Sequence, residues 1–514
     1  MNTFYADGSM KELVRRAESA AAADCAGETD NPTLRLLLGL EAEGVRYCHW
    51  KSNVRLSGTL SGDEDIDILI DRRQAERFQS VVSAQGFKLA RSRLGSDYPG
   101  VFHAIGLDET RGELLDLHAY HRVLSGDSFV KTYLFPVAEA LLQGDARHLG
   151  VRVPSAEAEY VIFILRIALK SLAPVEIWKC NLHYDEVIEE LAWLRARSDR
   201  SRAAALCSEL FPSVDDALFR KAEAAIEERD ALIRRILIGI VLSWRLRHLR
   251  RLGPVRGLLA HVARLFTYAL ARFQKRRDGV PRAGGVIVAL VGPKATGKST
   301  ISNALAKRFG KHLDVVQIHA GKPPPTLLSA LPRLFVPLAR RLFPAERLRE
   351  YETPERRKSR QYSLFYVIRM TLLAYDRRKL LLRAHRRSAA GTIVISDRYP
   401  SHQVGAIDSS CFDDAAVVLA GSRIKRRLMK WERRLYRDLP RPDIVLQLHA
   451  PIELALERDG SRIKEGGPDA EAVRRRWWIE SDVDFPDTPL EPIDTQLPVE
   501  QSVLNAMNAV WKLI

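Results

Sequence analysis

The residues with the clearest chemical potential lie in the stretch Gly285–Thr300, which reads GVIVALVGPKATGKST. The β-branched run Val286–Val291 predicts a strand, a loop of the form G-x-x-x-x-G-K-S follows it, and a helix is predicted from Ser299 onward. This order of elements is the context that a phosphate-binding P-loop needs. Gly292 and Gly297 would let backbone N–H groups turn inward around phosphate oxygens, where the positive end of the new helix adds attraction.

The side chains of this loop predict a nucleotide site that uses Mg²⁺. Lys298 would place its ammonium near the β and γ phosphates, and the Ser299 hydroxyl would ligate the Mg²⁺ that bridges them. We therefore expect ATP and Mg²⁺ as cofactors. A glycine-rich turn that holds no ligand is the alternative, and a P-loop alone does not say what receives the phosphoryl group. The predicted cofactor-binding residues are Gly292, Lys294, Thr296, Gly297, Lys298, Ser299 and Thr300.

The length of the chain and its local patterns predict how these residues are positioned. A chain of 514 residues is too long for one core, so we expect several domains. The predicted fold class is α/β: a C-terminal P-loop domain with a parallel sheet and helices on both faces, and an N-terminal α+β domain with a helical extension. The predicted segments are 1–152 for the N-terminal domain, 153–230 for the helical extension, 231–283 for a basic helical connector and 284–514 for the P-loop domain.

Composition limits the classes of partner and compartment. The net charge of +16 and the pI near 9.7 indicate an anionic partner such as nucleotide, nucleic acid or a lipid surface, although an arginine-rich soluble protein accounts for them equally well. The five cysteines are scattered and lack C-x-x-C spacing, which argues against a disulfide framework or a zinc site. We expect a cytoplasmic protein, peripheral to the membrane at most, because no signal peptide and no apolar run of about 20 residues is evident.

A second group of acidic residues lies in the N-terminal part. The stretch Asp65–Ile70 alternates as a strand does, so Asp65 and Asp67 project from the same face. Asp116 lies on a later apparent strand, between two leucines. Three such carboxylates could hold Mg²⁺ against a triphosphate. A solvated acidic edge strand is the alternative explanation.

This part of the chain resembles the minimal nucleotidyltransferase fold, whose signature is a Gly-Ser turn, a D-h-D strand and a third Asp on a later strand. Ser52 matches the serine, Asp65 and Asp67 match the metal pair, and Asp116 is the candidate for the third carboxylate. Lys51 stands where the family has glycine before the serine. The resemblance implies a second nucleotide site or nucleotidyl transfer.

The predicted connector is unusually basic. Between residues 231 and 277 there are twelve Lys or Arg residues and no Asp or Glu, interleaved with apolar residues. Such basic amphipathic helices can lie on an anionic membrane or bind phosphate backbones. We favour a helical hairpin whose apolar stripe packs between domains, because Gly253 and Pro254 break the run in two.

After the P-loop, a long helix is predicted at Tyr362–His385 and buried parallel strands at Thr392–Ser396 and Ile444–Leu448. With the P-loop, these elements resemble the thymidylate kinase family of nucleoside monophosphate kinases. The landmarks, in the family's order, are VGPKATGKST, LLAYDRRKLL, VISDRYP, RPDIVLQLHAPIELALER and PIDTQLPVEQSV. The resemblance implies phosphoryl transfer from ATP to an acceptor that already bears a phosphate.

Carried onto this chain, the resemblance gives each polar residue a role. Arg377, Arg398 and Tyr399 would bind the acceptor, Asp397 would position Mg²⁺, and Arg458 and Arg462 would be lid arginines that act with Lys298 in catalysis. Lys294 stands where the family usually has a carboxylate that recognises the sugar, so we expect thymidylate to be a poor acceptor.

Three functions therefore follow from the sequence. The first is an ATP- and Mg²⁺-dependent kinase acting on a phosphate-bearing small molecule. The second is a nucleotidyltransferase with a regulatory P-loop domain. The third is a non-catalytic nucleotide-binding switch that docks on an anionic membrane or nucleic acid through the basic connector.

Overall fold

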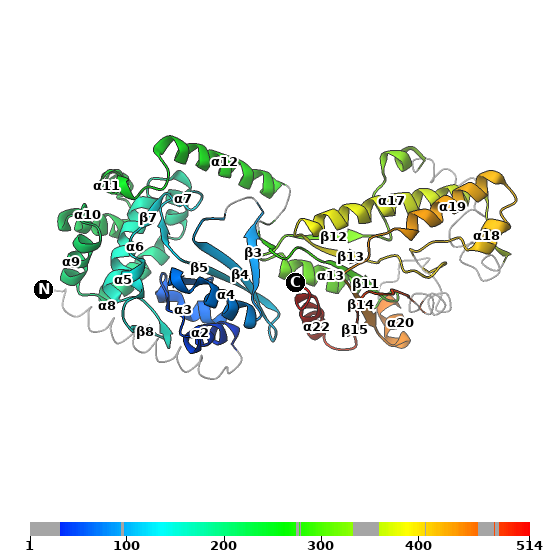
Figure 1. The fold of residues 1–514 in the computed structure, drawn as a ribbon, viewed down its shortest axis with the longest axis horizontal. Coiled ribbons are helices and arrows are strands. Elements are labelled where there is room, and N and C mark those ends of the chain that lie inside the picture. The colour runs from blue at the N-terminus through cyan, green and yellow to red at the C-terminus, as the bar shows by residue number, and fades with distance from the viewer. Residues whose placement is uncertain are drawn as a thin grey trace. The chain divides into compact units, whose positions relative to one another are not determined.

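The computed structural model describes residues 31–93, 97–273, 277, 279–332, 359–406, 408–460, 477 and 483–514. The contacts among them divide the chain into two compact units (Figure 1). The first unit contains residues 31–108 and 113–277, and the second contains residues 109–112 and 279–514. The contacts therefore join most of the predicted connector to the first unit.

The first unit begins with a mixed sheet. Its strands are β1 (Tyr47–His49), β2 (Ile66–Ile70), β3 (Lys88–Ser92), β4 (Val101–Asp108) and β5 (Glu113–Tyr120), in the order β1-β2-β5-β4-β3. Strands β2 and β5 are parallel, and the other neighbouring pairs are antiparallel. Alternation along β2 buries Ile66, Ile68 and Ile70 in one core cluster, so Asp67 projects from the other face. The accompanying elements are α2 (Pro32–Ala42), η1 (Asn53–Arg55), α3 (Leu56–Ser61), η2 (Arg72–Gln74) and α4 (Ala75–Ala84).

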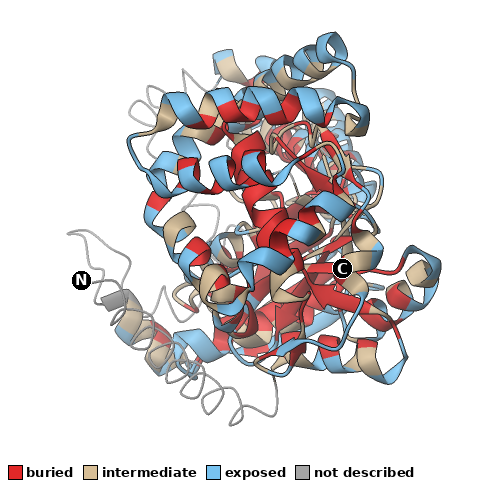
Figure 2. Cartoon of the chain, turned by 90° about the vertical axis from the view of Figure 1, so that its left-hand side faces the viewer, coloured by how far each residue is buried: buried red, intermediate tan, exposed pale blue. Residues whose placement is uncertain are grey.

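A helical layer completes this unit around α6 (Ala156–Lys170). Ser155 caps α6 by accepting a hydrogen bond from the backbone N–H of Ala158, and most residues of the helix are buried. Buried residues gather on the inner elements, whereas the outer helices expose one side (Figure 2). The other elements are β6 (Val123–Ser125), β7 (Tyr133–Phe135), α5 (Ala138–Leu142), β8 (Arg147–His148), β9 (Val151–Arg152), α7 (Pro174–Leu182), α8 (Tyr184–Arg197), α9 (Arg200–Leu210), α10 (Asp216–Glu227), α11 (Leu232–Arg245), η3 (Arg247–Leu249) and α12 (Pro254–Phe273).

The second unit is built on a parallel sheet, as predicted. Its strands are β11 (Ile287–Val291), β12 (Val315–His319), β13 (Ile393–Asp397), β14 (Ile444–His449) and β15 (Leu490–Asp494), in the order β12-β13-β11-β14-β15. All four pairings are parallel. The other elements are β10 (Gly279–Pro281), α13 (Lys298–Phe309), α17 (Leu364–Ala389), α18 (Asp414–Val418), α19 (Arg423–Arg437), α20 (Ile452–Gly460) and α22 (Val499–Trp511).

Helices cover both faces of this sheet. The face that carries Ile287, Ala289 and Val291 packs against Leu381 and Ala384 of α17. Helix α13 contacts β11, β12, β13 and α22 on the other side (Figure 1). The α/β fold of the second unit is therefore confirmed.

The strand order creates a topological switch point at the carboxyl end of β11. Strand β11 has β13 on one side and β14 on the other, so the chain turns in opposite directions on either side of it. In open α/β sheets, ligands bind outside the carboxyl ends of the strands at such a switch point. The P-loop leaves β11 at this point, and Leu290 lies in register with Asp397 of β13.

Candidate functional site: a P-loop and a carboxylate cluster

The backbone of the P-loop depends on residues with a positive φ. Gly292 has φ +138°, and a Cβ there would lie 2.6 Å from the carbonyl oxygen of Leu448. Gly297 has φ +90° and precedes α13 in the left-handed region, and Ala295 also has a positive φ. Glycine is the residue that adopts such angles without steric cost, which is why two glycines recur at this spacing.

The start of α13 is open to an anion. Its N-cap is Gly297, which provides no side-chain hydrogen bond, and the first turn contains no acidic residue. Uncapped N–H groups and the helix dipole both favour negative charge at this position. Lys298 is 8% exposed, and its ammonium donates to the carbonyl oxygens of Gly292 at 2.7 Å and Pro293 at 2.6 Å. The side chain of Lys298 therefore folds back over the loop between Gly292 and Gly297.

The remaining loop residues divide into supporting and accessible ones. Thr296 is fully buried, and its hydroxyl donates to the carbonyl oxygen of Pro293 at 2.8 Å, which holds the loop closed. Lys294 is half-buried, whereas Ser299 and Thr300 are exposed at the start of α13. The exposed hydroxyls are therefore the ones that a ligand could reach.

Ser299 and Asp397, the two predicted Mg²⁺ ligands of this loop, are in contact. The Ser299 hydroxyl donates to Oδ2 of Asp397 at 3.2 Å, across the space between α13 and the end of β13. Oδ1 of Asp397 is buried and has no hydrogen-bond partner among the described residues. A buried acceptor without a partner is costly. A hydroxyl beside such a carboxylate is an oxygen donor set that fits Mg²⁺.

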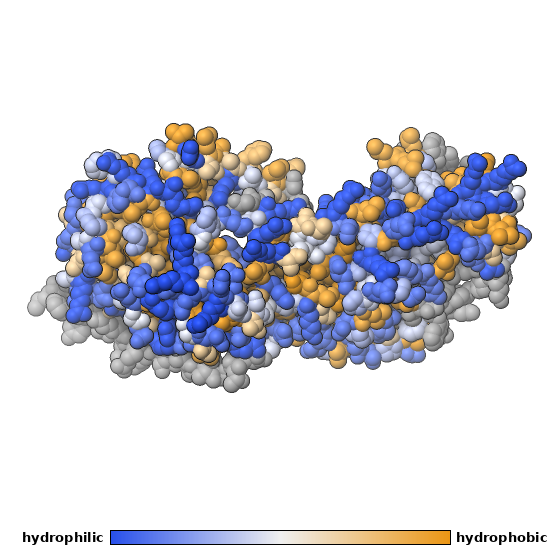
Figure 3. Space-filling view, viewed as in Figure 1, coloured by the Kyte–Doolittle hydropathy of each residue, from blue (hydrophilic) through white to orange (hydrophobic). Residues whose placement is uncertain are grey.

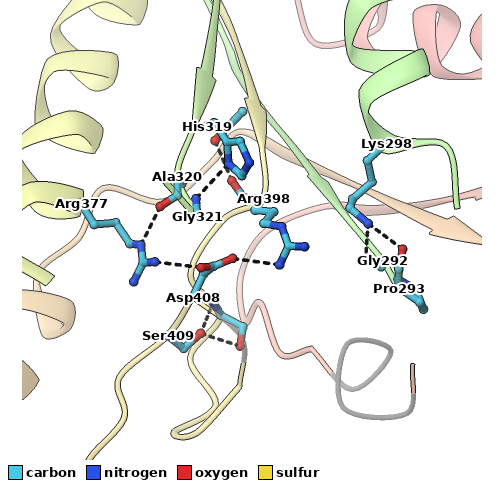
Figure 4. A network of polar contacts seen from close by, with 12 residues as sticks. Gly292, Pro293, Lys298, His319, Ala320, Gly321, Arg377, Arg398, Asp408 and Ser409 are labelled. Carbon is cyan, nitrogen blue, oxygen red and sulfur yellow. Dashed lines mark hydrogen bonds and ion pairs between the residues drawn. The ribbon is translucent and has the colours of Figure 1, made fainter. Parts of the chain in front are cut away.

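Arg377 and Arg398 lie close together, but they share an internal carboxylate. Nη2 of Arg377 is 2.8 Å from Oδ1 of Asp408, and Nη1 of Arg398 is 3.3 Å from its Oδ2. Figure 4 shows the two guanidinium groups approaching Asp408 from opposite sides, with Lys298 beyond Arg398. Asp408 is thus the anion that these two arginines hold.

Arg377 is fixed in place by further contacts. Its Nε donates to the carbonyl oxygen of Ala320 at 2.7 Å, and its Nη1 donates to the hydroxyl of Tyr436. The side chain is almost completely buried. Burial alone would lower its pKa, but Tyr436 and Asp408 outweigh burial and raise the pKa. Arg398 is more exposed and has φ +73°, a strained angle for a long side chain.

Three other predicted residues lie in different settings. Tyr399 is buried, and its hydroxyl donates to the carbonyl oxygen of Pro440, so that group is already used within the protein. Arg458 of α20 donates to the carbonyl oxygen of Thr495 at 2.8 Å. Arg462 lies outside the described residues.

The first unit brings its three predicted carboxylates around one histidine. Asp67 on β2 is in register with His118 on β5, and Asp116 lies two residues before His118 on the same face. Nδ1 of His118 is 3.6 Å from Oδ1 of Asp67 and 3.8 Å from Oδ2 of Asp65, while Nε2 is 3.4 Å from Oδ1 of Asp116. Parallel pairing of β2 with β5 therefore assembles the cluster.

Cations of the chain neutralise part of this carboxylate cluster. Nζ of Lys51 is 2.9 Å from Oδ1 of Asp67. Burial would raise the pKa of Asp67, but Lys51 and His118 lower it far below its ordinary value. Burial would lower the pKa of His118, but hydrogen bonds with Asp116 and Asp67 raise it well above its ordinary value. The surrounding carboxylates therefore favour the protonated form of His118.

The cluster contains a donor set for a divalent cation. Single ligand atoms of His103, Asp116 and His118 lie within 4.8 Å of one another. His103 on β4 faces His118 on β5, and their rings meet edge to face at 4.6 Å. Imidazole and carboxylate ligands suit Zn²⁺, Mn²⁺ or Mg²⁺ to different degrees. A metal held by these three residues would require a neutral His118, so it would replace the ion pairs that a protonated His118 makes with Asp67 and Asp116.

Basic side chains also gather beside the carboxylate cluster. Lys51 and the Arg166 guanidinium both lie over the ring of Trp50, at 5.6 Å and 5.1 Å from its centroid. Lys131 has its pKa lowered to about 7, by burial first and then by the charges of Lys51, Lys170 and Arg166. Like charges held together in this way favour an anionic ligand.

The sequence contained a signal for only some of these residues. His118 follows Asp116 in a strand-like stretch, so alternation could have placed both on one face. Asp408 lies in an irregular segment after β13, and nothing in its neighbourhood indicates that two arginines bind it. Lys131 and Arg166 are distant in sequence from the carboxylates, and only the fold brings them near.

Comparison with known proteins identifies no family. No protein-family model matches this chain, and no curated protein matches it. Among solved structures, the chain is similar to an unliganded crystal structure of a sugar kinase from Janibacter sp. HTCC2649, with 14% sequence identity and a TM-score of 0.22. The match covers 44% of this chain and 93% of the sugar kinase. At that TM-score the likeness says nothing about activity or substrate.

Proposed function

We propose that the second unit transfers the γ-phosphoryl group of ATP to a small molecule that already bears a phosphate. The observation that carries this proposal is the pairing of Ser299 with Asp397 beside an uncapped helix start, at the switch point of a parallel sheet. Phosphoryl transfer needs little covalent chemistry and mainly asks for well-placed positive charge. The positions of Lys298, Ser299 and Asp397 around one helix start support this proposal.

Each group has a distinct role in the proposed reaction. The loop N–H groups and Lys298 hold the β and γ phosphates. Lys298 also stabilises the negative charge that develops on the transferred group. Ser299 and Asp397 hold Mg²⁺, which when bound offsets phosphate charge. Lys298 must exchange its contacts with Gly292 and Pro293 for phosphate oxygens. A bound phosphate would therefore take the place of these two carbonyl oxygens around the ammonium of Lys298.

The acceptor site is assigned to Arg398, with Arg377 as a positioning residue. All three nitrogens of the Arg377 guanidinium contact protein atoms, so Arg377 acts through Asp408. Arg398 is more exposed and faces the same carboxylate from the other side. An acceptor phosphate would compete with Asp408 for Arg398. Arg458 and Arg462 are retained in this proposal as lid arginines.

Mass spectrometry of products tests the proposal. The full chain is incubated with ATP, Mg²⁺ and a panel of nucleoside monophosphates, sugar phosphates and lipid phosphates. We expect one class of phosphate-bearing acceptor to gain a phosphate, and thymidine monophosphate to be a poor one because Lys294 would meet an anion more readily than a ribose hydroxyl. ATP binding without phosphate transfer to any class would contradict the proposal and favour a nucleotide-binding switch.

A matched pair of variants tests the metal assignment. Asp397→Asn is expected to raise the Mg²⁺ concentration needed for half-maximal turnover. Asp494→Asn is the control, because Asp494 ends β15 of the same sheet but has no contact with Ser299 among the hydrogen bonds of the described residues. Equal Mg²⁺ dependence in the two variants would remove Asp397 from the site.

The carboxylate cluster favours a second candidate function, nucleotidyl transfer by the first unit. This candidate is supported by the approach of Asp65, Asp67 and Asp116 to His118 and by the basic group beside them, which suits a triphosphate. Transfer from an α-labelled triphosphate that is lost in Asp67→Asn and kept in Lys298→Ala would establish it. Its absence with every nucleotide would leave the kinase as the working enzyme.

A further inference from the structure

Helix α12 of the first unit is amphipathic, and its apolar side faces outward instead of toward the core. Its outer side carries large apolar residues that are 46% to 87% exposed. Figure 3 shows hydrophobic side chains along this helix, at the top of the view. We call these residues the outer stripe: Val255, Leu258, Leu259, Val262, Phe266, Leu270 and Phe273.

The inner side of α12 contacts the rest of the first unit through polar groups and through the ring of Tyr268, which meets the ring of Phe129 edge to face at 5.8 Å. His261 pairs with Asp127, and the Arg264 guanidinium donates to the hydroxyl of Tyr98 and the carbonyl oxygen of Phe129. A surface helix normally turns its apolar face to the core and its polar face to water. The polar anchors instead fix α12 with the outer stripe facing outward.

Helix α11 repeats part of this pattern. It buries Ile238 and Leu242 in the core of the first unit. Ile233, Leu237 and Trp244 are 57% to 75% exposed at helical spacing. Single exposed apolar residues are common, but large apolar side chains grouped on neighbouring turns of two successive helices indicate an interaction site.

The charge around the outer stripe selects the kind of partner. The segment 231–277 contains twelve Lys or Arg and no acidic residue. Arg247, Arg256 and Arg272 are exposed, and the Arg247 guanidinium lies 4.7 Å from the centre of the Trp244 ring. Apolar residues that enter a lipid surface, with arginines that contact its headgroups, are the combination that interfacial helices use.

We propose that α12 lies on an anionic lipid surface with its outer stripe in the acyl-chain boundary. A second copy of this chain is disfavoured because it would bring two acid-free cationic segments together. Nucleic acid would use the arginines but leave the stripe in water. The helix docks and does not cross, since no helix among the described residues is long and apolar enough to span a membrane.

Vesicle sedimentation of the full chain tests this proposal. We expect binding to vesicles of phosphatidylcholine with phosphatidylglycerol, and much weaker binding to phosphatidylcholine alone. The double variant Leu259→Glu/Phe266→Glu should lower partitioning about tenfold or more, because it places charge in the stripe. Arg256→Glu/Arg272→Glu should lower binding to anionic vesicles and raise its sensitivity to salt.

Control variants separate docking from general effects of surface charge. Leu38→Glu on α2 of the first unit and Val418→Glu on α18 of the second unit alter side chains that are 55% and 74% exposed and do not belong to the outer stripe. Both should partition like the parent chain, and circular dichroism should show that all variants are folded. Equal loss in the controls would contradict a specific docking face.

Three outcomes would overturn the proposal. The first is no binding to either kind of vesicle. The second is binding to duplex DNA or RNA that Arg256→Glu/Arg272→Glu abolishes, when vesicles do not bind. The third is a dimer in sedimentation velocity that Leu259→Glu/Phe266→Glu dissociates. None of them depends on turnover by the second unit. Failure of the kinase proposal and failure of the docking proposal are therefore distinguishable.

Discussion

The P-loop and the carboxylate cluster are assembled from different kinds of structure. The P-loop site uses backbone N–H groups and one helix start from a contiguous stretch, and a single distant residue, Asp397, completes it. The cluster in the first unit uses side chains from β2 and β5 and from the turn after β1. Its geometry therefore depends on strand register, whereas the P-loop depends mainly on two glycines.

The two sites also differ in which charge the protein already neutralises. In the second unit, Asp408 occupies the space between two arginines. In the first unit, Lys51 and His118 occupy the space among the carboxylates. A ligand of the second unit must displace or share an internal anion, while a metal in the first unit must displace internal cations. Displacing or sharing Asp408 leaves the P-loop itself accessible, so we expect catalysis in the second unit.

The largest expected effect is on turnover. Lys298→Ala should lower phosphoryl transfer by about a hundredfold to a thousandfold, the usual cost of removing one preorganised charge from a transition state. The control is Lys307→Ala, an exposed lysine in the last turn of the same helix. Single-turnover assays with γ-labelled ATP measure both. Near-parental turnover in Lys298→Ala would show that the P-loop does not catalyse the reaction.

The next effect concerns stability and distinguishes the two arginines. Arg377→Met should lower the free energy of unfolding of the second unit by about 3–5 kcal/mol, because it breaks a buried ion pair. Arg398→Met should cost about 1 kcal/mol because its ion pair is partly solvated. It should instead raise the KM for the acceptor. Urea titrations and initial rates measure these quantities, and equal unfolding costs would contradict the separate roles.

Much of the second unit could be predicted from its sequence because the decisive patterns are local. The predicted strands at Thr392–Ser396 and Ile444–Leu448 correspond to β13 and β14, and the helix predicted at Tyr362–His385 corresponds to α17. Each is a continuous run whose period or β-branched content is sufficient by itself. The pairing of Ser299 with Asp397 follows once the carboxyl ends of parallel strands are known to meet.

The rest depended on contacts that no local pattern encodes. The resemblance predicts that the two arginines cradle an acceptor phosphate, but no sequence pattern indicates that Asp408 lies between them. Arg166 on α6 meets Trp50 beside Lys51 only in the folded chain, and Lys131 comes near Lys51 from the segment between β6 and β7. The reversed orientation of α12 also could not be read from its amphipathic sequence, since either face could have been buried. Packing decides such cases, and periodicity does not.

A smaller effect is a change in how stability depends on pH. The pKa of His118 is higher in the folded chain than its ordinary value of 6.5. Its contribution is therefore fully present below pH 6.5 and is lost as the pH rises through the folded pKa. His118→Gln should unfold more readily at pH 6 and lose less stability between pH 6 and 9. Urea titrations across this range, with His183→Gln on the exposed start of α8 as control, measure the difference. Parallel profiles for the His118 variant and the parent chain would contradict a raised pKa of His118 in the folded chain.

The smallest expected effect decides whether Tyr399 belongs to the site or to the core. The tyrosine is 5% exposed, and its hydroxyl donates to the carbonyl oxygen of Pro440. Tyr399→Phe should therefore lower the free energy of unfolding by about 0.5–1.5 kcal/mol, the net worth of one hydrogen bond, while kcat and KM stay unchanged. If the KM for the acceptor rises several-fold and stability does not change, the hydroxyl contacts the substrate, and Tyr399 then joins Arg398 in binding the acceptor.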